Sequence, residues 1–183
     1  NITPDKKTGI GSWTEKEFIR SMHEGKGKDG ENLFPVYPYL YFAKVSTKDA
    51  RALYAYLQSI PAVSRDNTKL GFPFNMPGAR ASLIGWKLLF FGDKERQQFK
   101  YEPSKSKEWN RGSYIVNGLG HCGMCHTPMN VFGAPKNEYF LTGSFIDGYW
   151  APNISSEALR RSSRLEVANV FKKSKLLNDA GPI

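Results

Sequence analysis

The sequence predicts an all-α fold in which short helices are joined by long loops. Hydrophobic residues make up 40% of the chain and aromatic residues 14%, which is sufficient for a packed core. The 17 glycines and 11 prolines among 183 residues indicate turn-rich connections between the helices. Three capping boxes mark helix starts, because a Ser or Thr and the acid three residues later satisfy each other's backbone N–H groups. The boxes pair Thr14 with Glu17, Ser46 with Asp49, and Ser163 with Glu166.

Each capping box is followed by residues with helical periodicity. The first box begins a helix that ends near Gly25, and the second begins a helix that Pro61 stops. The third box begins a helix that fades near Asn178. Two further helices are predicted at about residues 109–119 and 79–91. We expect the apolar residues of the helix at 79–91 to pack against the rest of the chain.

A weak internal repeat divides the chain. Residues 1–3 (Asn-Ile-Thr) and 153–155 (Asn-Ile-Ser) each precede a capping box and a short helix. Residues 1–61 are therefore predicted to be the C-terminal part of one module. Residues 62–108 are a connector with one helix, and residues 109–183 are the front part of a second module.

The only two cysteines of the chain lie in the sequence Cys-Gly-Met-Cys-His at residues 122–126. This Cys-x-x-Cys-His spacing is the signature of haem c attachment. On a helical turn, residues three and four apart share one face, so Cys122 and Cys125 can reach the two vinyl groups on one side of a haem. His126 can then point its imidazole at the iron as the proximal ligand. The motif predicts a covalently held haem c and electron transfer.

Other chemistries of this motif are less consistent with the sequence. A thiol redox Cys-x-x-Cys normally lies between a strand and a helix, and no βαβ pattern surrounds this one. A zinc site needs about four ligands, whereas the chain holds two cysteines and three histidines in all. A plain disulfide between Cys122 and Cys125 leaves the adjacent His126 without an explanation.

The distal side of the iron is left open by the sequence. A cytochrome specialised for electron transfer usually has a sixth ligand, often Met. Met124 and Met129 lie within or just after the motif, too close to wrap around the ring, and Met76 is an upstream alternative in a proline-flanked loop. Either a ligand lies beyond Ile183, or the iron is five-coordinate. A five-coordinate iron favours ligand binding or peroxidase-like chemistry.

Three aromatic residues near the motif are candidates for the wall of a haem pocket, although each also suits an ordinary core. They are Trp109, Tyr114 and Trp150. The formal net charge of +9 favours an acidic redox partner or an anionic membrane face. Nucleic acid is not expected, because the basic residues are scattered and no nucleic-acid motif is present. No apolar run approaches the ~18 residues of a membrane span.

Three segments resemble the multihaem cytochrome c subunits of bacterial membrane-bound dehydrogenases. They are residues 108–116, 118–128 and 150–154. The resemblance implies tandem class I cytochrome c modules, with the first and last modules incomplete in this chain. It also implies a periplasmic, membrane-associated electron-transfer subunit without activity of its own, bound to the membrane through missing segments or through the complex. Electrons would pass from a dehydrogenase catalytic subunit through successive haems to the quinone pool or an oxidase.

Two positions depart from the family pattern. Tyr37 stands where many family members have the Met that is the distal ligand of the first haem, and a neutral phenol is a poor substitute. Met129 stands where the family usually has Arg, so a charge near the haem is lost. An open-site haem protein therefore remains the alternative function, and a Cys-x-x-Cys thiol redox protein is a further one.

Overall fold

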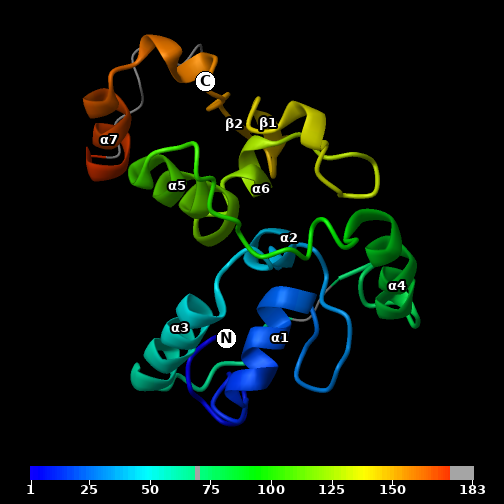
Figure 1. Ribbon diagram of the computed structural model, residues 1–183. Helices are drawn as coiled ribbons and strands as arrows, with labels where there is room; N and C mark the ends of the chain where they lie inside the picture. The colour runs from blue at the N-terminus through cyan, green and yellow to red at the C-terminus, as the bar shows by residue number, and fades with distance from the viewer. Residues whose placement is uncertain (69–70, 174–183) are drawn as a thin grey trace. The chain divides into compact units, whose positions relative to one another are not determined.

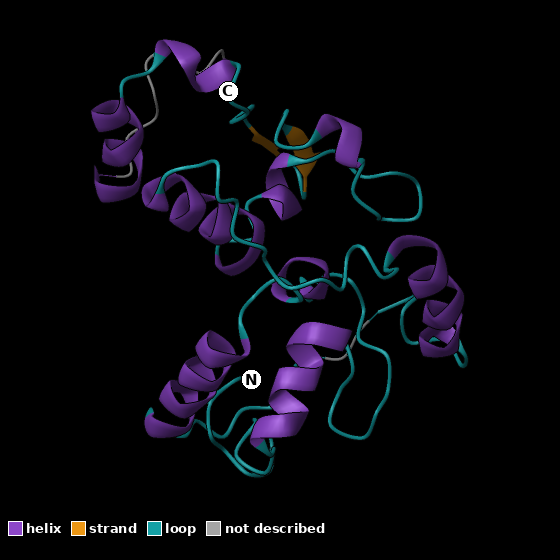
Figure 2. Ribbon diagram, in the orientation of Figure 1, coloured by secondary structure: helices purple, strands orange, loops and turns teal. Residues whose placement is uncertain are grey.

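The computed structural model describes residues 1–68 and 71–173, and it is mostly helical (Figures 1 and 2). The chain divides into two compact units, an N-terminal unit of Asn1–His121 and a C-terminal unit of Cys122–Ile183. Among the helices described, none combines the length and the apolar character that a membrane-spanning segment requires.

The N-terminal unit contains five α-helices in its described part. They are α1 (Glu15–Glu24), α2 (Tyr39–Phe42), α3 (Thr47–Ser59), α4 (Ala79–Phe90) and α5 (Lys107–Tyr114), which a π-helical turn, η1 (Ile115–Leu119), continues. The helices predicted at about 79–91 and 109–119 are thus confirmed, with the second beginning two residues earlier than expected.

The predicted capping residues define where the helices begin. Thr14 Oγ1 accepts a hydrogen bond from Glu17 N, and Glu17 Oε2 accepts one from Thr14 N at 2.7 Å. Gly25, in the left-handed region with φ 60°, ends α1 as expected. Ser46 Oγ caps α3 by accepting from the backbone N–H of Asp49.

The C-terminal unit holds shorter elements. They are α6 (Gly123–His126), the 3₁₀ turns η2 (Asn137–Tyr139) and η3 (Ala158–Arg161), strands β1 (Ser144–Ile146) and β2 (Tyr149–Ala151), and α7 (Arg164–Lys173). Ser163 and Glu166 cap α7 reciprocally, which confirms the third box. The predicted end of this helix near Asn178 lies outside the described residues.

The all-α prediction missed a small antiparallel hairpin in the C-terminal unit (Figure 2). Phe145 of β1 faces Trp150 of β2, and Asp147 and Gly148 form the turn with φ values of 48° and 85°. An Asp-Gly pair is a strong hairpin signal because both central positions of a type I′ turn need positive φ. Strands of three residues are too short to show the alternation that reveals longer strands.

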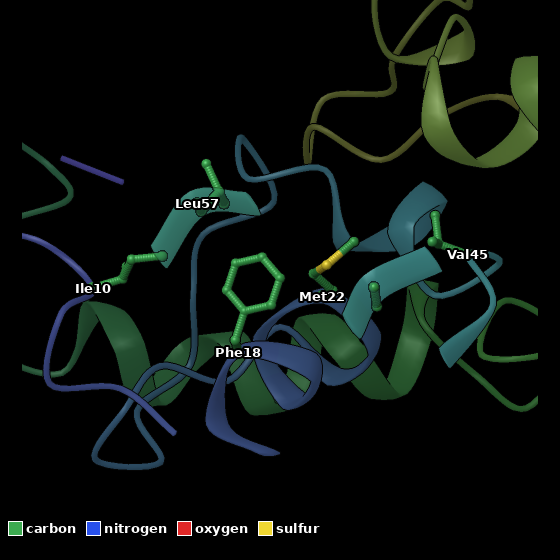
Figure 3. Close-up of a cluster of buried hydrophobic side chains, with 6 residues drawn as sticks. Ile10, Phe18, Met22, Val45 and Leu57 are labelled. Atoms are coloured by element: carbon green, nitrogen blue, oxygen red, sulfur yellow. The ribbon is translucent and has the colours of Figure 1, made fainter. Parts of the chain in front are cut away.

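The core of the N-terminal unit lies where α1 packs against α2 and α3. Phe18 and Met22 are four residues apart and therefore share one face of α1. Figure 3 shows Phe18 pointing from α1 into the cluster, with Ile10 and Leu57 on one side of its ring and Met22 on the other. The cluster comprises Ile10, Phe18, Met22, Val45, Ala50 and Leu57.

Helix α4 packs in a way that contradicts the expectation from its apolar residues. Leu83 is buried, but Ile84, Leu88 and Leu89 are exposed. The buried face instead includes Lys87, which is only 6% exposed. The expectation that the apolar residues of this helix pack inward is therefore wrong for those three residues, because the cation occupies the inner face.

Candidate haem attachment site

The Cys-x-x-Cys-His motif forms a single helical turn. The backbone N–H of His126 donates to Cys122 O at 3.0 Å, and that of Thr127 donates to Gly123 O at 3.1 Å. This turn places residues 122, 125 and 126 on one face, as the spacing predicts. Both thiols are free, with Cys122 half-buried and Cys125 exposed. Burial raises the pKa of the Cys122 thiol.

The imidazole of His126 is held through one of its two ring nitrogens. His126 Nδ1 lies 2.7 Å from the carbonyl oxygen of Pro152. A carbonyl oxygen can only accept, so Nδ1 carries a proton, and in the neutral ring Nε2 is the nitrogen with the lone pair. Metal-binding histidines typically donate their second ring N–H to a carbonyl or carboxylate in this way, which makes the other nitrogen a better ligand.

Backbone contacts around the hairpin hold this arrangement. Gly143 N donates to His126 O at 2.9 Å, and the fully buried Thr127 accepts from Leu141 N through Oγ1 at 3.0 Å. Gly143 has φ 96°, and a Cβ there would lie 3.0 Å from Ala151 O. Glycine is therefore required where the chain turns back beneath the histidine.

Sequence reasoning missed three of the residues that position His126. Thr127 and Pro152 lie within segments noted only for a family resemblance, whereas Gly143 carries no signal of its own. The contact between Pro152 and His126 joins residues 26 apart in the chain. Only the fold of the C-terminal unit brings them together.

The segment before the motif belongs to the N-terminal unit. His121 has a positive φ of 37° and packs edge-on against Phe42, with ring centroids 5.4 Å apart. The preceding π-helical turn η1 is a rare conformation that is frequent at functional sites.

The remaining histidine, His23, lies in α1. His23 Nε2 lies 2.9 Å from Val45 O, and burial lowers the pKa of the His23 imidazole.

The other predicted site residues are dispersed over the two units. Tyr114, 8% exposed, donates to Asp49 Oδ2 at 2.6 Å within the N-terminal unit, and Trp109 is 49% exposed on α5. Trp150 is 54% exposed on β2, and Met76 is 50% exposed in the connector. Their assignment to a haem pocket, or to the iron in the case of Met76, stays a prediction.

The features of the motif match one kind of cofactor site. In the described residues, no group of three or more His, Cys, Asp or Glu side chains could together hold a metal ion. Two free thiols and an imidazole on one turn are the groups that haem c attachment uses. The turn follows η1 rather than a strand, unlike the setting of a thiol redox motif.

Comparison with known proteins identifies relatives of one kind, although no family model matches the chain. A subunit of nicotinate dehydrogenase from Pseudomonas putida is 42% identical over 166 residues, covering 89% of this chain and 13% of that protein. The fructose dehydrogenase cytochrome subunit of Gluconobacter japonicus is 38% identical over 85% of this chain and 32% of its own length. The cytochrome c subunit of quinone alcohol dehydrogenase from Gluconobacter oxydans is 33% identical over 98% of this chain and 39% of its own length.

Over most of its length, the chain is a homologue of cytochrome c subunits of bacterial dehydrogenases. The chain spans less than half the length of each of the relatives named here, between 13% and 39%. The resemblance inferred from the motif and its flanking segments is thereby confirmed. The mostly helical structure with its small hairpin is compatible with a cytochrome c fold.

Proposed function

We propose that the chain is an electron-transfer segment of a multihaem cytochrome c subunit. Cys122 and Cys125 bind one haem c through thioether bonds, and His126 is the proximal iron ligand. The observation that carries the proposal is the hydrogen bond from His126 Nδ1 to Pro152 O at 2.7 Å, which keeps Nε2 available beside two free thiols. When bound, the haem supplies a centre that takes up and releases one electron.

The residues of the chain act on this centre by position rather than by acid–base chemistry. Cys122 and Cys125 would hold the haem covalently, and the imidazole of His126 would bind its iron. The Pro152 carbonyl orients the imidazole and strengthens its donation, which tunes the reduction potential. Trp150 on β2 is proposed to contact the ring, whereas Trp109 and Tyr114 are weaker candidates, because Tyr114 is already hydrogen-bonded to Asp49.

Tandem cytochrome c modules are part of the proposal. Asn1 Oδ1 accepts from Thr3 N at 3.0 Å, and Asn153 Oδ1 accepts from Ser155 N at 2.9 Å. The same turn therefore precedes both capped helices, α1 and α7. We assign residues 1–61 to the end of one module, 62–108 to the connector and 109–183 to the front of the next.

The proposed setting is the periplasm, where haem c is attached. The subunit accepts electrons from the catalytic subunit of a membrane-bound dehydrogenase and passes them to the quinone pool or an oxidase. Membrane association comes from the complex or from segments outside this chain. The net charge of +9 favours an acidic surface on the redox partner.

A haem with an open iron site is the second candidate function. It is favoured by the methionines of the described C-terminal unit, because Met124 and Met129 both lie on the proximal side, next to His126 in the chain. Met129 pairs with Pro135 in a bridge and is 38% exposed. Met76 remains the weak candidate for the distal position. Carbon monoxide binding to the reduced protein distinguishes the two functions, because a six-coordinate Met-ligated iron resists it.

The test is expression of the chain in a periplasm with haem c maturation, followed by an alkaline pyridine spectrum. We expect a c-type spectrum and haem that stays on the chain in a denaturing gel. Cys122→Ala or Cys125→Ala should leave one vinyl group unreacted and shift the spectrum, while the double variant should lose covalent haem. Met124→Leu, inside the motif, is the matched control and should keep the wild-type spectrum. A wild-type chain without c-type bands contradicts the proposal.

A further inference from the structure

Leu141, in the loop between η2 and β1, has a strained backbone. Its φ of 64° lies in the left-handed region, which a bulky side chain rarely adopts because its Cβ crowds the backbone. Gly143, two residues later, takes the same region without that cost. A strained residue persists only where the surrounding contacts hold it, and such residues cluster at functional sites.

Both backbone polar groups of Leu141 are hydrogen-bonded, each to a different part of the C-terminal unit. Its N–H donates to Thr127 Oγ1 at 3.0 Å, and its carbonyl oxygen accepts from Ile154 N at 2.9 Å. Thr127 is fully buried and directly follows His126, while Ile154 lies two residues after Pro152. Leu141 therefore ties the chain after the proposed iron ligand to the chain after the carbonyl that orients it.

These contacts form a closed hydrogen-bond network around His126. The chain leads from His126 to Thr127, and hydrogen bonds lead on to Leu141 and then to Ile154. Two residues before Ile154 is Pro152, whose carbonyl oxygen lies 2.7 Å from His126 Nδ1. The network lies where α6 contacts β1 (Figure 1). Because the hydrogen bonds of a network support one another, loosening Leu141 also loosens the imidazole.

We propose that Leu141 is a positioning residue of the iron site and sets its reduction potential, by holding the Pro152 carbonyl against the imidazole of His126. The inference rests on the proposed function, in which His126 Nε2 binds the iron. A hydrogen bond to the second ring N–H makes an imidazole a stronger donor, and a stronger donor favours ferric over ferrous iron. Release of Leu141 should therefore raise the potential.

The other role open to Leu141 is packing of its half-buried side chain. Two substitutions separate the roles, because they change the side chain and the backbone preference in opposite directions. Leu141→Ile keeps an apolar side chain of the same composition, but β-branching disfavours a left-handed backbone. Leu141→Asn removes the apolar side chain, but Asn adopts the left-handed region more readily than most residues.

The test is a redox titration of the haem-loaded protein, combined with hydrogen exchange of the Ile154 amide. In Leu141→Ile the potential should rise, and the amide should exchange roughly tenfold faster or more, because its hydrogen bond is lost. In Leu141→Asn both should match the wild type. The opposite order shows that packing carries the role and overturns the proposal, as does an unchanged potential in Leu141→Ile.

Thr127 allows the network to be cut without changing Leu141. Thr127→Val has nearly the same shape but no acceptor, so the potential should rise as in Leu141→Ile. Thr127→Ser keeps the hydroxyl and should have the wild-type potential. Thr142→Val is the matched control, since the Thr142 hydroxyl donates to Tyr139 O at 2.8 Å, outside the network. A potential that stays constant in Thr127→Val, or that shifts equally in Thr127→Ser, overturns the proposal.

The proton shifts of the haem methyl groups in the ferric protein report the orientation of the axial imidazole. They should change in Leu141→Ile and Thr127→Val and stay constant in Leu141→Asn and Thr127→Ser. A raised potential without a change in these shifts means that the substitutions act through solvent exposure rather than through His126, which also overturns the proposal.

The two proposals fail in different ways. A wild-type chain without c-type absorption bands contradicts the proposed function and, with it, this role of Leu141. Normal c-type bands with an unchanged potential contradict only the role of Leu141. If Leu141→Ile and Thr127→Val do not accumulate with haem, Leu141→Asn and Thr127→Ser decide, and a changed potential in either overturns the proposal.

Discussion

The two units of this chain differ in what holds them together. The N-terminal unit buries large apolar side chains, including Phe18, Met22 and Tyr39, between helices of ordinary length. In the described part of the C-terminal unit, the buried residues are small. They are Gly123, Thr127, Ala134 and Gly143.

Large apolar residues of the C-terminal unit lie at its surface instead. They include Val131, Phe145, Tyr149, Trp150, Leu165 and Phe171. The order of this unit comes from backbone hydrogen bonds around α6 and the hairpin, centred on His126. A small unit needs more than such bonds for stability, and a tightly bound cofactor commonly supplies it. From this contrast we expect that the N-terminal unit folds on its own core, whereas the C-terminal unit depends on the haem that we propose it attaches.

The largest expected effect is the loss of the C-terminal unit when the attachment is removed. In Cys122→Ala/Cys125→Ala, the amides of residues 122–173 should lose protection from hydrogen exchange. The amides of α1 and α3 should remain protected, because their core does not involve the motif. If the C-terminal unit of the double variant keeps wild-type protection from hydrogen exchange, the expected difference in stability between the two units is wrong.

The second effect compares two phenylalanines. Phe18→Ala, at a residue 6% exposed in the N-terminal core, should lower the free energy of unfolding by about 3–5 kcal/mol, through lost burial and the cavity left behind. Phe171→Ala, at a residue 82% exposed on α7, should change it by no more than about 0.5 kcal/mol. Urea unfolding of the haem-loaded protein measures both. Equal losses of unfolding free energy in Phe18→Ala and Phe171→Ala would show that α7 has a packed partner in solution.

The third effect concerns the anchor of the helix that precedes the motif. Tyr114 donates to Asp49 Oδ2 at 2.6 Å and accepts from Ser46 N at 3.0 Å. Burial and the neighbouring carboxylate raise the pKa of this phenol. Tyr114→Phe leaves both partners unpaired and should cost about 1–3 kcal/mol of unfolding free energy.

A double-mutant cycle of Tyr114→Phe with Asp49→Ala isolates this contact. Tyr101→Phe, at a tyrosine 56% exposed in the same unit, is the control and should leave stability unchanged. Additive losses in the cycle would show that α5 is held by ring packing alone.

The fourth effect is the pH dependence that Lys87 contributes. Burial, together with the nearby charges of Lys26 and Arg96, lowers the pKa of Lys87 to about 8 from 10.5, while Glu24 opposes the shift. Between these values the unfolded chain binds more protons than the folded one, so stability rises with pH in this range. The stability of the wild type relative to Lys87→Met should therefore increase between pH 8 and about 10.5. A constant difference across that range would mean that the amine titrates as it does in water.

Local rules account for what could be predicted from the sequence. The capping residues Thr14, Ser46 and Ser163 each contact a residue three positions later, and the attachment motif spans a single turn. Such contacts depend little on the rest of the fold, so their residue pattern is sufficient to predict them. The hairpin does not show as periodicity because its strands have three residues each, and its Asp147–Gly148 turn is its sequence signal.

The orientation of α4 shows what local sequence patterns cannot predict. The apolar residues of this helix favour inward packing, and the helix predicted at about 79–91 is present at Ala79–Phe90. The direction of its faces depended on Lys87, which finds carbonyls 62 and 63 residues away at Gly25 and Glu24. Nothing in the spacing of the helix residues indicates such partners.

The sequence by itself predicted the Cys-x-x-Cys-His motif that we propose attaches the haem, and it determined the starts of three capped helices. It also determined the relationship to cytochrome c subunits, through residues 122–126 and the segments around them. The tertiary structure alone decided that Pro152 orients His126 and that α4 turns its leucines outward. The reason is that a contact within one helical turn is encoded by neighbours in the chain. A contact across 26 or 62 residues exists only once the whole backbone has brought donor and acceptor together.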